Sequence, residues 1–255
     1  MKLRVLGCYG AKMPGFATSA FLVGDSILLD AGAVTSQLSL KEQVKIRSIL
    51  VSHTHMDHVK DILFLADNVN AQNSHPIRVY SSRGVVRGIK KNLFNWLIWP
   101  DFTQIPNPRH PMIRFKAIPV GKKFRVEGRR VLAFKSNHTV ESLGYLIEGD
   151  QGWLLYSGDT GPNPKMWKLV NTIGNVKAMI VDVSFPNEME KLARISRHMT
   201  PRMLEEDMKN LKGQQGVKIY VSHMKPAYLK ALSRELRKLT DPPVTILSPG
   251  TKIEF

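Results

Sequence analysis

The spacing of apolar residues along the chain predicts short strands interleaved with helices. Apolar or alternating runs, typical of strands, lie at 3–6, 20–23, 26–29, 46–51 and 78–80. Later runs of the same kind lie at 115–120, 123–126, 131–135, 145–148, 153–156, 178–183 and 217–221. Apolar residues three or four positions apart predict helices over 59–69, 85–97, 201–211 and 230–239. Gly24 and Asp25 are expected to form a two-residue hairpin turn between the second and third strands.

These elements predict a single α/β domain over residues 1–255. The chain has no linker-like stretch, no low-complexity segment and no repeat with a clean period. Many strands interspersed with helices favour sheets that are covered by helices on their outer faces.

Composition excludes several classes of protein. Hydrophobic residues make up 43% of the 255 residues and charged residues 23%, which suits a globular chain with a large core and not a disordered one. No apolar run approaches the ~18 residues of a membrane span, and the first residues lack a signal-peptide core. The single cysteine, Cys8, excludes an internal disulfide framework and is expected to be a small core residue. We therefore expect a cytoplasmic protein.

The charge balance favours an anionic partner. Lysine and arginine number 37 against 21 acidic residues, a formal net charge of +16. Nucleic acid, a nucleotide or a phosphate would each complement this charge. The basic residues are scattered and form no polybasic tail, so a merely solubilising basic surface is the alternative.

The strongest chemical signal lies where a predicted buried strand meets a helix, in His53-Thr54-His55-Met56-Asp57-His58. Three imidazoles and a carboxylate so close together would carry desolvation penalties if they were buried without partners. A metal ion removes that penalty, because imidazole and carboxylate are good ligands for zinc-like ions. In an extended segment His53 and His55 project to one side, and the turn into the helix aims Asp57 and His58 at a second point. One loop can thus serve two ions roughly 3.5–4 Å apart.

Three later candidates each follow a predicted strand, where the loops of one sheet edge converge. They are His138 in Ser136-Asn137-His138-Thr139, Asp159 in Ser157-Gly158-Asp159-Thr160-Gly161-Pro162, and His223 in Ser222-His223-Met224-Lys225-Pro226. A single histidine after a strand is commonly structural, but these three complete two ligand sets. The simplest assignment gives one ion His53, His55 and His138, gives the other Asp57, His58 and His223, and makes Asp159 the bridge. We expect two divalent ions, zinc first, with manganese or iron as alternatives, and an activated water between them.

The HxHxDH cluster, the later histidine, the Gly-Asp motif and the final histidine, in that order, resemble the metallo-β-lactamase superfamily. The resemblance spans nearly the whole chain and implies a four-layer αββα sandwich. Asp30, in Leu28-Leu29-Asp30-Ala31-Gly32, resembles the superfamily's early motif, in which the aspartate supports the ligands. A turn residue that ends a strand is the alternative for Asp30.

A narrower set of peptides resembles the class II cyclic-nucleotide phosphodiesterases. Besides the Ser157–Pro162 peptide, they are His138-Thr139-Val140 leading to Gly144-Tyr145, Ser184-Phe185-Pro186-Asn187, His198-Met199-Thr200-Pro201 and His223-Met224-Lys225-Pro226. This resemblance implies cleavage of 3′,5′-cyclic nucleotides to the 5′-monophosphate at a dinuclear metal site. The chain departs from that family's pattern at Met56, where leucine is more usual, and at Asp61, where a small residue is more usual. These departures keep the ligands and leave the substrate open.

Three features outside the ligand set stay open between a functional and a structural role. His198 is a candidate general acid or phosphate contact, or else a helix-entry histidine bonded to nearby backbone. Lys225 is a phosphate contact or a solvated lysine. The aromatic run at 94–102, which Pro100 interrupts, is a helix end in the core, or else a lid, a base-stacking surface or a dimer contact.

We therefore expect a metal-dependent phosphodiester hydrolase, and the resemblance favours a cyclic-nucleotide phosphodiesterase. Asp57 and Asp159 would hold the ions and the attacking water, and His198 would act on the leaving oxygen. A ribonuclease Z-like nuclease explains the charge better, although the chain has no long inserted basic and glycine-containing arm. A lactonase or thioesterase on the same scaffold and a metal-dependent nucleic-acid-binding or sensor protein are further alternatives. The expected partners are an anionic small molecule or nucleotide, with nucleic acid or a second copy of the chain as candidates, and no membrane.

Overall fold

Two seven-stranded sheets form the centre of the molecule. The computed structural model describes residues 1–72, 75–213 and 216–255. The first sheet has the order β16 (Lys252–Glu254), β1 (Lys2–Gly7), β2 (Ala20–Val23), β3 (Ile27–Leu29), β4 (Ser48–Leu50), β5 (Ile77–Ser81) and β8 (Ile113–Ala117). The second has the order β15 (Val244–Ile246), β14 (Lys218–Ser222), β13 (Val176–Asp182), β12 (Trp153–Tyr156), β11 (Leu143–Glu148), β10 (Arg129–Lys135) and β9 (Lys123–Val126). A small hairpin pairs β6 (Pro106–Asn107) with β7 (His110–Pro111).

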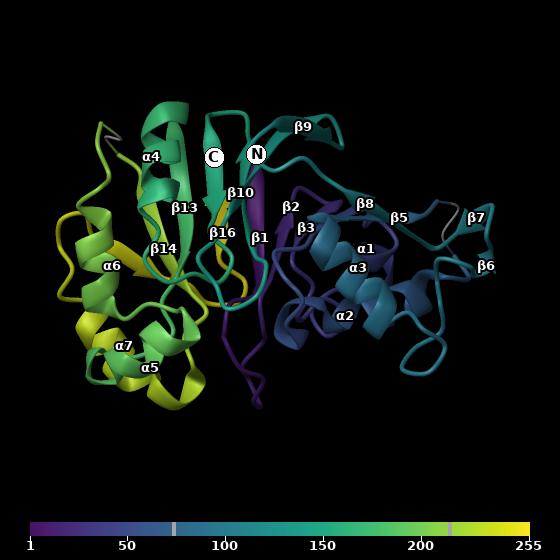
Figure 1. The fold of residues 1–255 in the computed structure, drawn as a ribbon, viewed down its shortest axis with the longest axis horizontal. Coiled ribbons are helices and arrows are strands. Elements are labelled where there is room, and N and C mark those ends of the chain that lie inside the picture. The colour runs from purple at the N-terminus through teal and green to yellow at the C-terminus, as the bar shows by residue number, and fades with distance from the viewer. Residues whose placement is uncertain (73–74, 214–215) are drawn as a thin grey trace.

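Helices cover the outer face of each sheet (Figure 1). The first sheet carries α1 (Leu40–Gln43), α2 (Met56–Val69) and α3 (Arg83–Asn92). The second carries α4 (Pro164–Ile173), α5 (Glu190–Ser196), α6 (Pro201–Met208) and α7 (Leu229–Leu236), with 3₁₀ turns at Asn187–Met189 and Pro226–Tyr228. Among the described residues, no helix has both the length and the apolar character that crossing a bilayer requires.

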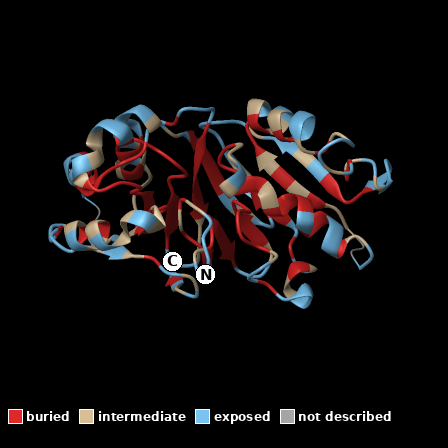
Figure 2. Ribbon diagram, turned by 90° about the horizontal axis from the view of Figure 1, so that it is seen from below, coloured by how far each residue is buried: buried red, intermediate tan, exposed pale blue. Residues whose placement is uncertain are grey.

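Three clusters of buried apolar side chains fill the three interfaces of this αββα sandwich. One lies between the first sheet and α2 and α3, one between the two sheets, and one between the second sheet and its helices. Strand β10 shows how one sequence serves two interfaces. Val131 and Ala133 face the other sheet, whereas Leu132 and Phe134 face the helices, as the period of two in a strand requires. Figure 2 shows the sheets as the most continuously buried part of the ribbon. The expected α/β sandwich is confirmed.

The direction of the strands gathers chemistry-bearing loops at one edge. Strands β12, β13 and β14 pair in parallel, so their carboxyl ends lie at the same edge of the second sheet. Strands β3 and β4 pair in parallel in the first sheet. The loops that leave these five strands carry most of the acidic and histidine residues described below, and His138, which follows β10, joins them.

Several predicted boundaries were wrong. The helix expected over 85–97 ends at Asn92, because the chain turns at Trp96, whose φ of 64° is incompatible with a helix. Three residues, not two, separate β2 from β3. The third, Ser26, leaves the hairpin because its carbonyl accepts the backbone N–H groups of Arg47 and Ser48 at the start of β4. Helix α4 was not predicted, although Asn163 and Pro164 are a typical N-cap and first helical residue.

Candidate metal centre

The first group of candidate ligands comes from the loop between β4 and α2. His53 lies in the extended part of this loop, and His55 is the N-cap residue of α2 with φ −62° and ψ 143°. The first helical turn then carries Asp57 and His58. The helix start lies close to the chain at Gly32, where an added Cβ would be 1.8 Å from the Asp57 carbonyl oxygen. Only glycine permits this approach, which fixes the direction of the first turn of α2.

The remaining candidates lie on loops that follow strands of the second sheet. His138 follows β10, Asp159 follows β12 and His223 follows β14. Gly158 has φ +60°, a conformation suited to glycine, and it turns Asp159 back toward the first sheet. His223 also has a positive φ of 66°, and its N–H donates to the Cys8 carbonyl at 2.6 Å. Non-glycine residues in this conformation cluster at functional sites, where surrounding contacts hold them.

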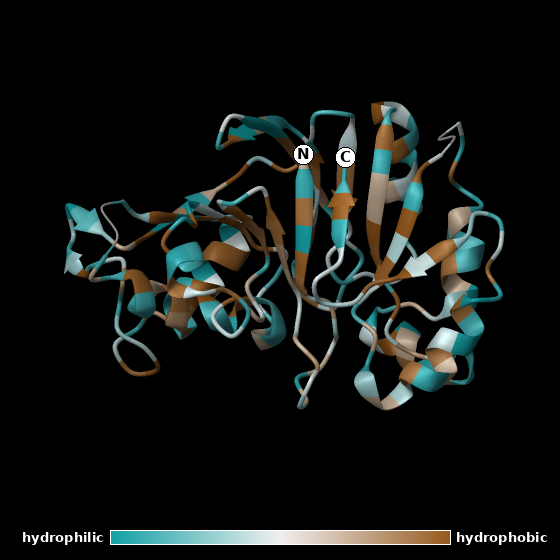
Figure 3. Ribbon diagram, turned by 180° about the vertical axis from the view of Figure 1, so that it is seen from behind, coloured by the Kyte–Doolittle hydropathy of each residue, from teal (hydrophilic) through white to brown (hydrophobic). Residues whose placement is uncertain are grey.

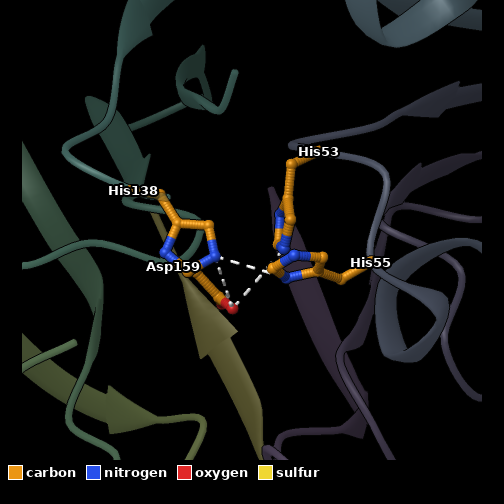
Figure 4. A group of neighbouring side chains, drawn as sticks. All are labelled: His53, His55, His138 and Asp159. Carbon is orange, nitrogen blue, oxygen red and sulfur yellow. Dashed lines mark hydrogen bonds and ion pairs between the residues drawn. The ribbon is translucent and has the colours of Figure 1, made fainter. Parts of the chain in front are cut away.

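His53, His55, His138 and Asp159 form one cluster, and their side chains point toward one another in Figure 4. One potential ligand atom from each lies within 4.8 Å of the others. His53 Nε2 is 3.6 Å and His138 Nε2 is 4.0 Å from Asp159 Oδ2. His138 Nε2 lies 3.3 Å from His55 Nδ1. Three imidazoles and a carboxylate thus converge from two different sheets.

Asp57, His58 and His223 form a second cluster beside the first. His223 Nε2 lies 3.3 Å from both Asp57 Oδ2 and His58 Nε2. Asp159 contacts this cluster as well, since its Oδ1 is 3.3 Å from His58 Nε2 and its Oδ2 is 3.3 Å from His223 Nε2. The Asp159 carboxylate therefore lies between the two clusters.

The structure brings together all seven residues that the sequence suggested as ligands. It also groups His198 with Asp159 and His223, as the functional interpretation of His198 requires. The division of the seven residues between two ions stays a prediction.

Burial and neighbouring charges shift the pKa values of these groups in different directions. Burial lowers the pKa values of His53, His55 and His138, which favours the neutral imidazole that binds metals. Burial alone would also lower the pKa of His58, but the charges of Asp159 and Asp30 raise it well above its usual value. Burial opposes ionisation of Asp159, yet the neighbouring imidazoles hold its pKa well below the ordinary range. The centre therefore sets the ionised Asp159 carboxylate beside the neutral imidazoles of the first cluster, whereas His58 retains a proton more readily because two carboxylates face it.

The surroundings of His53 Nε2 indicate whether these residues suit a metal ion. His53 is fully buried, and among the described residues nothing forms a hydrogen bond with its Nε2. Its other nitrogen, Nδ1, lies 2.9 Å from Ser52 Oγ. A buried ring nitrogen without a partner is costly, and an ion would remove that cost. The nitrogen and carboxylate donors around it are those that zinc, manganese and iron accept, so the residues fit divalent metal ions.

Asp30 stabilises the loop between β4 and α2 through buried hydrogen bonds. This fully buried carboxylate accepts hydrogen bonds from the Ser52 N–H and hydroxyl, both at 2.7 Å, and from the Tyr156 hydroxyl at 2.6 Å. Its Oδ2 also lies 2.7 Å from His58 Nδ1. The sequence suggested this role for Asp30 but gave no sign of Ser52 or Tyr156, because both are typical strand or turn residues.

A second buried acid orients His198. Asp182, the last residue of β13, places Oδ2 2.6 Å from His198 Nδ1 and accepts a hydrogen bond from the Thr160 N–H. The Ser184 hydroxyl donates to Asp182 and lies 2.9 Å from His223 Nδ1. Burial lowers the pKa of His198, but Asp182 outweighs this effect and raises it. Asp182 was not singled out from the sequence, although an acid at the end of a buried strand was a usable signal. Ser184 was noted only as part of a family-like peptide, without this role.

A hollow of about 300 Å³ opens beside His198 and is lined by Arg194, Arg197 and Asn137 among others. Arg197 Nη1 donates to the His138 carbonyl at 2.6 Å, which ties this arginine to the metal cluster. Lys225 donates to the Gly10 carbonyl and is half-buried, so it is not a freely solvated lysine. Arg197 thus contacts the backbone of a clustered residue, and Lys225 lies two residues after His223.

Two other residues singled out in the sequence, Cys8 and Asp61, have structural roles. Cys8 is buried, and burial raises the pKa of its thiol to about 12, which makes it a poor nucleophile. Asp61 lies at the base of α2, where it accepts hydrogen bonds from the Val34 and Thr35 N–H groups. Asp61 thus anchors the loop after β3 without contacting the cluster.

Comparisons with known proteins agree with this geometry. A family profile described as "Beta-lactamase superfamily domain" matches residues 26–224. The chain is 26% identical over 254 residues to a protein of Yersinia pestis named "Probable 3′,5′-cyclic-nucleotide phosphodiesterase", an alignment covering 90% of this chain and 71% of the relative. It is 27% identical over 155 residues to "Ribonuclease Z" of Methanopyrus kandleri, covering 57% of this chain and 50% of the relative.

A solved structure has the same fold along its whole length. The crystal structure of unliganded yeast PDE1 superposes with a TM-score of 0.86 at 19% identity, and the match covers 100% of this chain and 99% of that one. The similarity at this identity concerns the fold alone.

Proposed function

Because the chain belongs to the beta-lactamase superfamily and is a hydrolase of that fold, we propose that it cleaves phosphodiester bonds, with a 3′,5′-cyclic nucleotide as substrate and the 5′-monophosphate as product. The single observation that carries this proposal is the position of Asp159 between two clusters of nitrogen and oxygen donors. Two ions that share one carboxylate are the arrangement used by two-metal hydrolases for phosphoryl chemistry.

The seven clustered side chains would hold the ions. His53, His55 and His138 would hold one ion, and Asp57, His58 and His223 would hold the other, with the Asp159 carboxylate available to either group. Divalent ions bound there supply positive charge for the phosphoryl oxygens and lower the pKa of a water. Asp30 keeps His58 in the orientation that leaves Nε2 free to bind, because it occupies Nδ1.

His198 is proposed to donate the proton that the leaving oxygen needs. Asp182 occupies its Nδ1, so the opposite nitrogen, Nε2, is the one available to a substrate. The ring stacks on His223 with centroids 5.1 Å apart, which keeps it beside the donor clusters. General acids of this kind contribute about 10²- to 10⁴-fold to a rate. Arg197 and Lys225 would bind and orient the charged phosphate from either side.

The choice of a cyclic nucleotide draws support from two sources. The relative from Yersinia pestis carries that activity in its name. The hollow beside His198 measures about 300 Å³, which is the lower end of the range for small-molecule sites, and two arginines line it. A compact anionic ligand suits such a hollow.

RNA processing of the ribonuclease Z type is a second candidate. The net charge of +16 suits a polyanion better than a single nucleotide, and a ribonuclease Z is among the relatives. Against it, the sequence has no long inserted arm of basic and glycine residues.

A substrate panel separates the two candidates. The zinc-loaded full chain is assayed against cyclic AMP, cyclic GMP, a precursor transfer RNA and bis(p-nitrophenyl) phosphate, with the His55→Ala variant as the metal-deficient control. We expect the wild type to cleave a cyclic nucleotide and the chromogenic diester, and His55→Ala to cleave neither. Cleavage of RNA without cyclic nucleotide would replace the first candidate by the second, and no cleavage of any phosphodiester would refute both.

A further inference from the structure

The loop that follows α3 presents three consecutive apolar side chains to solvent. Trp96, Leu97 and Ile98, here called the apolar tip, are 64%, 85% and 57% exposed. In Figure 3 this loop is the hydrophobic projection at the lower left, on the side that carries α2 and α3. Scattered exposed apolar residues are normal, but contiguous ones at a projecting turn mark an interaction site.

The apolar tip is held in a defined turn. Asn95 Oδ1 accepts the N–H groups of Leu97 at 3.1 Å and Ile98 at 2.8 Å, and the Trp96 N–H donates to the Trp99 carbonyl at 3.0 Å. Trp96 has φ +64°, an unfavourable conformation for a bulky side chain. Trp99 packs edge-on against Phe64 of α2, with ring centroids 5.1 Å apart. These contacts keep the base of the turn on the molecule and its apolar side chains directed outward.

The neighbouring helix carries only positive charge. Residues 83–100 contain no aspartate or glutamate, and the exposed side of α3 carries four cations, here called the cationic face: Arg83, Arg87, Lys90 and Lys91. None of these four forms an ion pair with a residue that the structure describes. Together with Val86, Phe94 and Asn95 they line an open hollow of about 530 Å³. Two acids lie near this surface. Asp101 is buried and bonded to Thr103. Glu141 is exposed and its Oε2 would lie 1.9 Å from a Cβ added at Gly84 of α3, so one carboxylate faces four cations and the surface keeps a positive balance.

We propose that the apolar tip and the cationic face dock this protein on the surface of an anionic lipid bilayer. The tip would enter the boundary between headgroups and acyl chains, with Trp96 at the interface, and the cations would contact lipid phosphates. The expectation of no membrane partner came from the lack of a spanning segment. A surface contact needs no such segment.

Charge and shape favour a bilayer over two other occupants. A second copy of the chain docked symmetrically through this surface would bring four cations against four, which is repulsive. A single-stranded nucleic acid would match the charge, but its bases stack on aromatic faces, and two of the three residues of the tip are aliphatic. Aliphatic side chains at a convex tip gain most from an apolar solvent such as the bilayer interior.

Docking in this way would bring the metal centre close to the membrane. A Cβ added at Gly88 of α3 would lie 3.2 Å from the Thr54 methyl group, and Thr54 separates His53 from His55. The cationic face therefore belongs to a helix that packs directly on the ligand loop. This docking does not depend on which phosphodiester the centre cleaves.

Vesicle co-sedimentation of the full chain tests the proposal. Vesicles of phosphatidylcholine alone are compared with vesicles that also contain phosphatidylserine, using wild type, Leu97→Ser/Ile98→Ser and Lys90→Gln/Lys91→Gln. Ile195→Ser is the matched control, because Ile195 is 68% exposed on the far side of the sandwich on α5. We expect wild type and the control to bind only the anionic vesicles, and each double variant to bind about tenfold more weakly or worse.

Hydrolysis of bis(p-nitrophenyl) phosphate by the same samples separates this result from the proposed function, since neither double variant touches the clusters and both should retain the wild-type rate. The proposal is overturned if wild type ignores anionic vesicles, or if the tip variant binds them as well as wild type does. It is also overturned if the tip variant instead abolishes a dimer, or the binding of a labelled single-stranded RNA, in the absence of vesicles.

Discussion

Asp30 Oδ2 lies 2.7 Å from His58 Nδ1, and both side chains are completely buried. The two residues follow neighbouring parallel strands, since Asp30 comes directly after β3 and His58 lies in the first turn of α2, after β4. This contact leaves His58 Nε2 directed at Asp159 and His223. Asp30 thus fixes the direction in which the potential ligand atom of His58 points, although Asp30 itself is not among the proposed ligands.

Replacing Asp30 with asparagine should weaken metal binding without removing a proposed ligand. The amide cannot accept all of the hydrogen bonds from Ser52, Tyr156 and His58 at once, so the His58 ring loses its fixed orientation. Loss of such a partner typically lowers metal affinity by about 10- to 100-fold. Competition with a chromogenic zinc chelator measures this. Asp25→Asn, in the exposed β2–β3 turn, is the control, and equal affinities for the two variants would contradict the role of Asp30.

Asp159→Asn should reduce hydrolysis and metal binding more than the substitution of a supporting residue does, because the Asp159 carboxylate contacts both clusters. We expect hydrolysis of a chromogenic diester to fall by more than about a hundredfold, the upper end for a supporting partner. Metal content after dialysis, measured by mass spectrometry, should fall with it. Asp67→Asn, on the exposed side of α2, should behave as wild type. An Asp159→Asn enzyme with full metal content and rate would show that this carboxylate bridges nothing.

His198→Ala should discriminate between leaving groups. A p-nitrophenolate leaves without a proton, so this variant should cleave bis(p-nitrophenyl) phosphate within about tenfold of the wild-type rate. A sugar alkoxide needs the proton, and for such a substrate the rate should fall by about 10²- to 10⁴-fold. Steady-state assays on both substrates measure the two ratios. Equal losses on both would assign His198 to the binding of metal or phosphate.

Asp182 should control the pH range over which His198 acts. The charge of Asp182 raises the pKa of His198, and a proton donor acts only while it is protonated. The rate with an alkoxide leaving group should therefore decline as pH rises through this pKa. In Asp182→Asn the pKa is lower, so the decline should begin at lower pH. An unshifted decline in the pH–rate profile would exclude this coupling.

Gly32→Ala should disturb the ligand loop mechanically. The new methyl group would lie 1.8 Å from the Asp57 carbonyl oxygen, so the first turn of α2 must move. We expect a loss of about 1–3 kcal/mol in the free energy of unfolding and weaker zinc binding. Gly88→Ala makes the same change in mid-helix, where alanine is favoured and the nearest atom is a side-chain methyl at 3.2 Å. Urea denaturation should find Gly88→Ala within about 1 kcal/mol of wild type, and equal destabilisation of both variants would contradict the steric argument.

The predictable part of the site was its local part. His53, His55, Asp57 and His58 are separated by a few residues, so their convergence follows from one extended segment and one helical turn. The supporting contacts span much longer separations, 126 residues for Tyr156 and Asp30. A tyrosine at the end of a strand carries no local sign of such a contact, so it could not be found without the tertiary structure.

The fold shows the same division between local and long-range information. Apolar periodicity located the long strands and α2, whose buried side is continuous. It also predicted a helix over 85–97, whereas α3 ends at Asn92. The prediction went too far because apolar residues such as Leu97 look like core residues in the sequence but are exposed in the structure. A surface that attracts an apolar partner has the same local pattern as a core, and only the packing distinguishes the two.

The most direct test of the central claim is a titration of the metal-free full chain with zinc while hydrolysis of bis(p-nitrophenyl) phosphate is followed. A two-metal site requires that the metal-free chain is inactive and that the rate rises until about two equivalents of zinc are bound. Full activity in the metal-free chain, or a rate that never rises with bound metal, would contradict it.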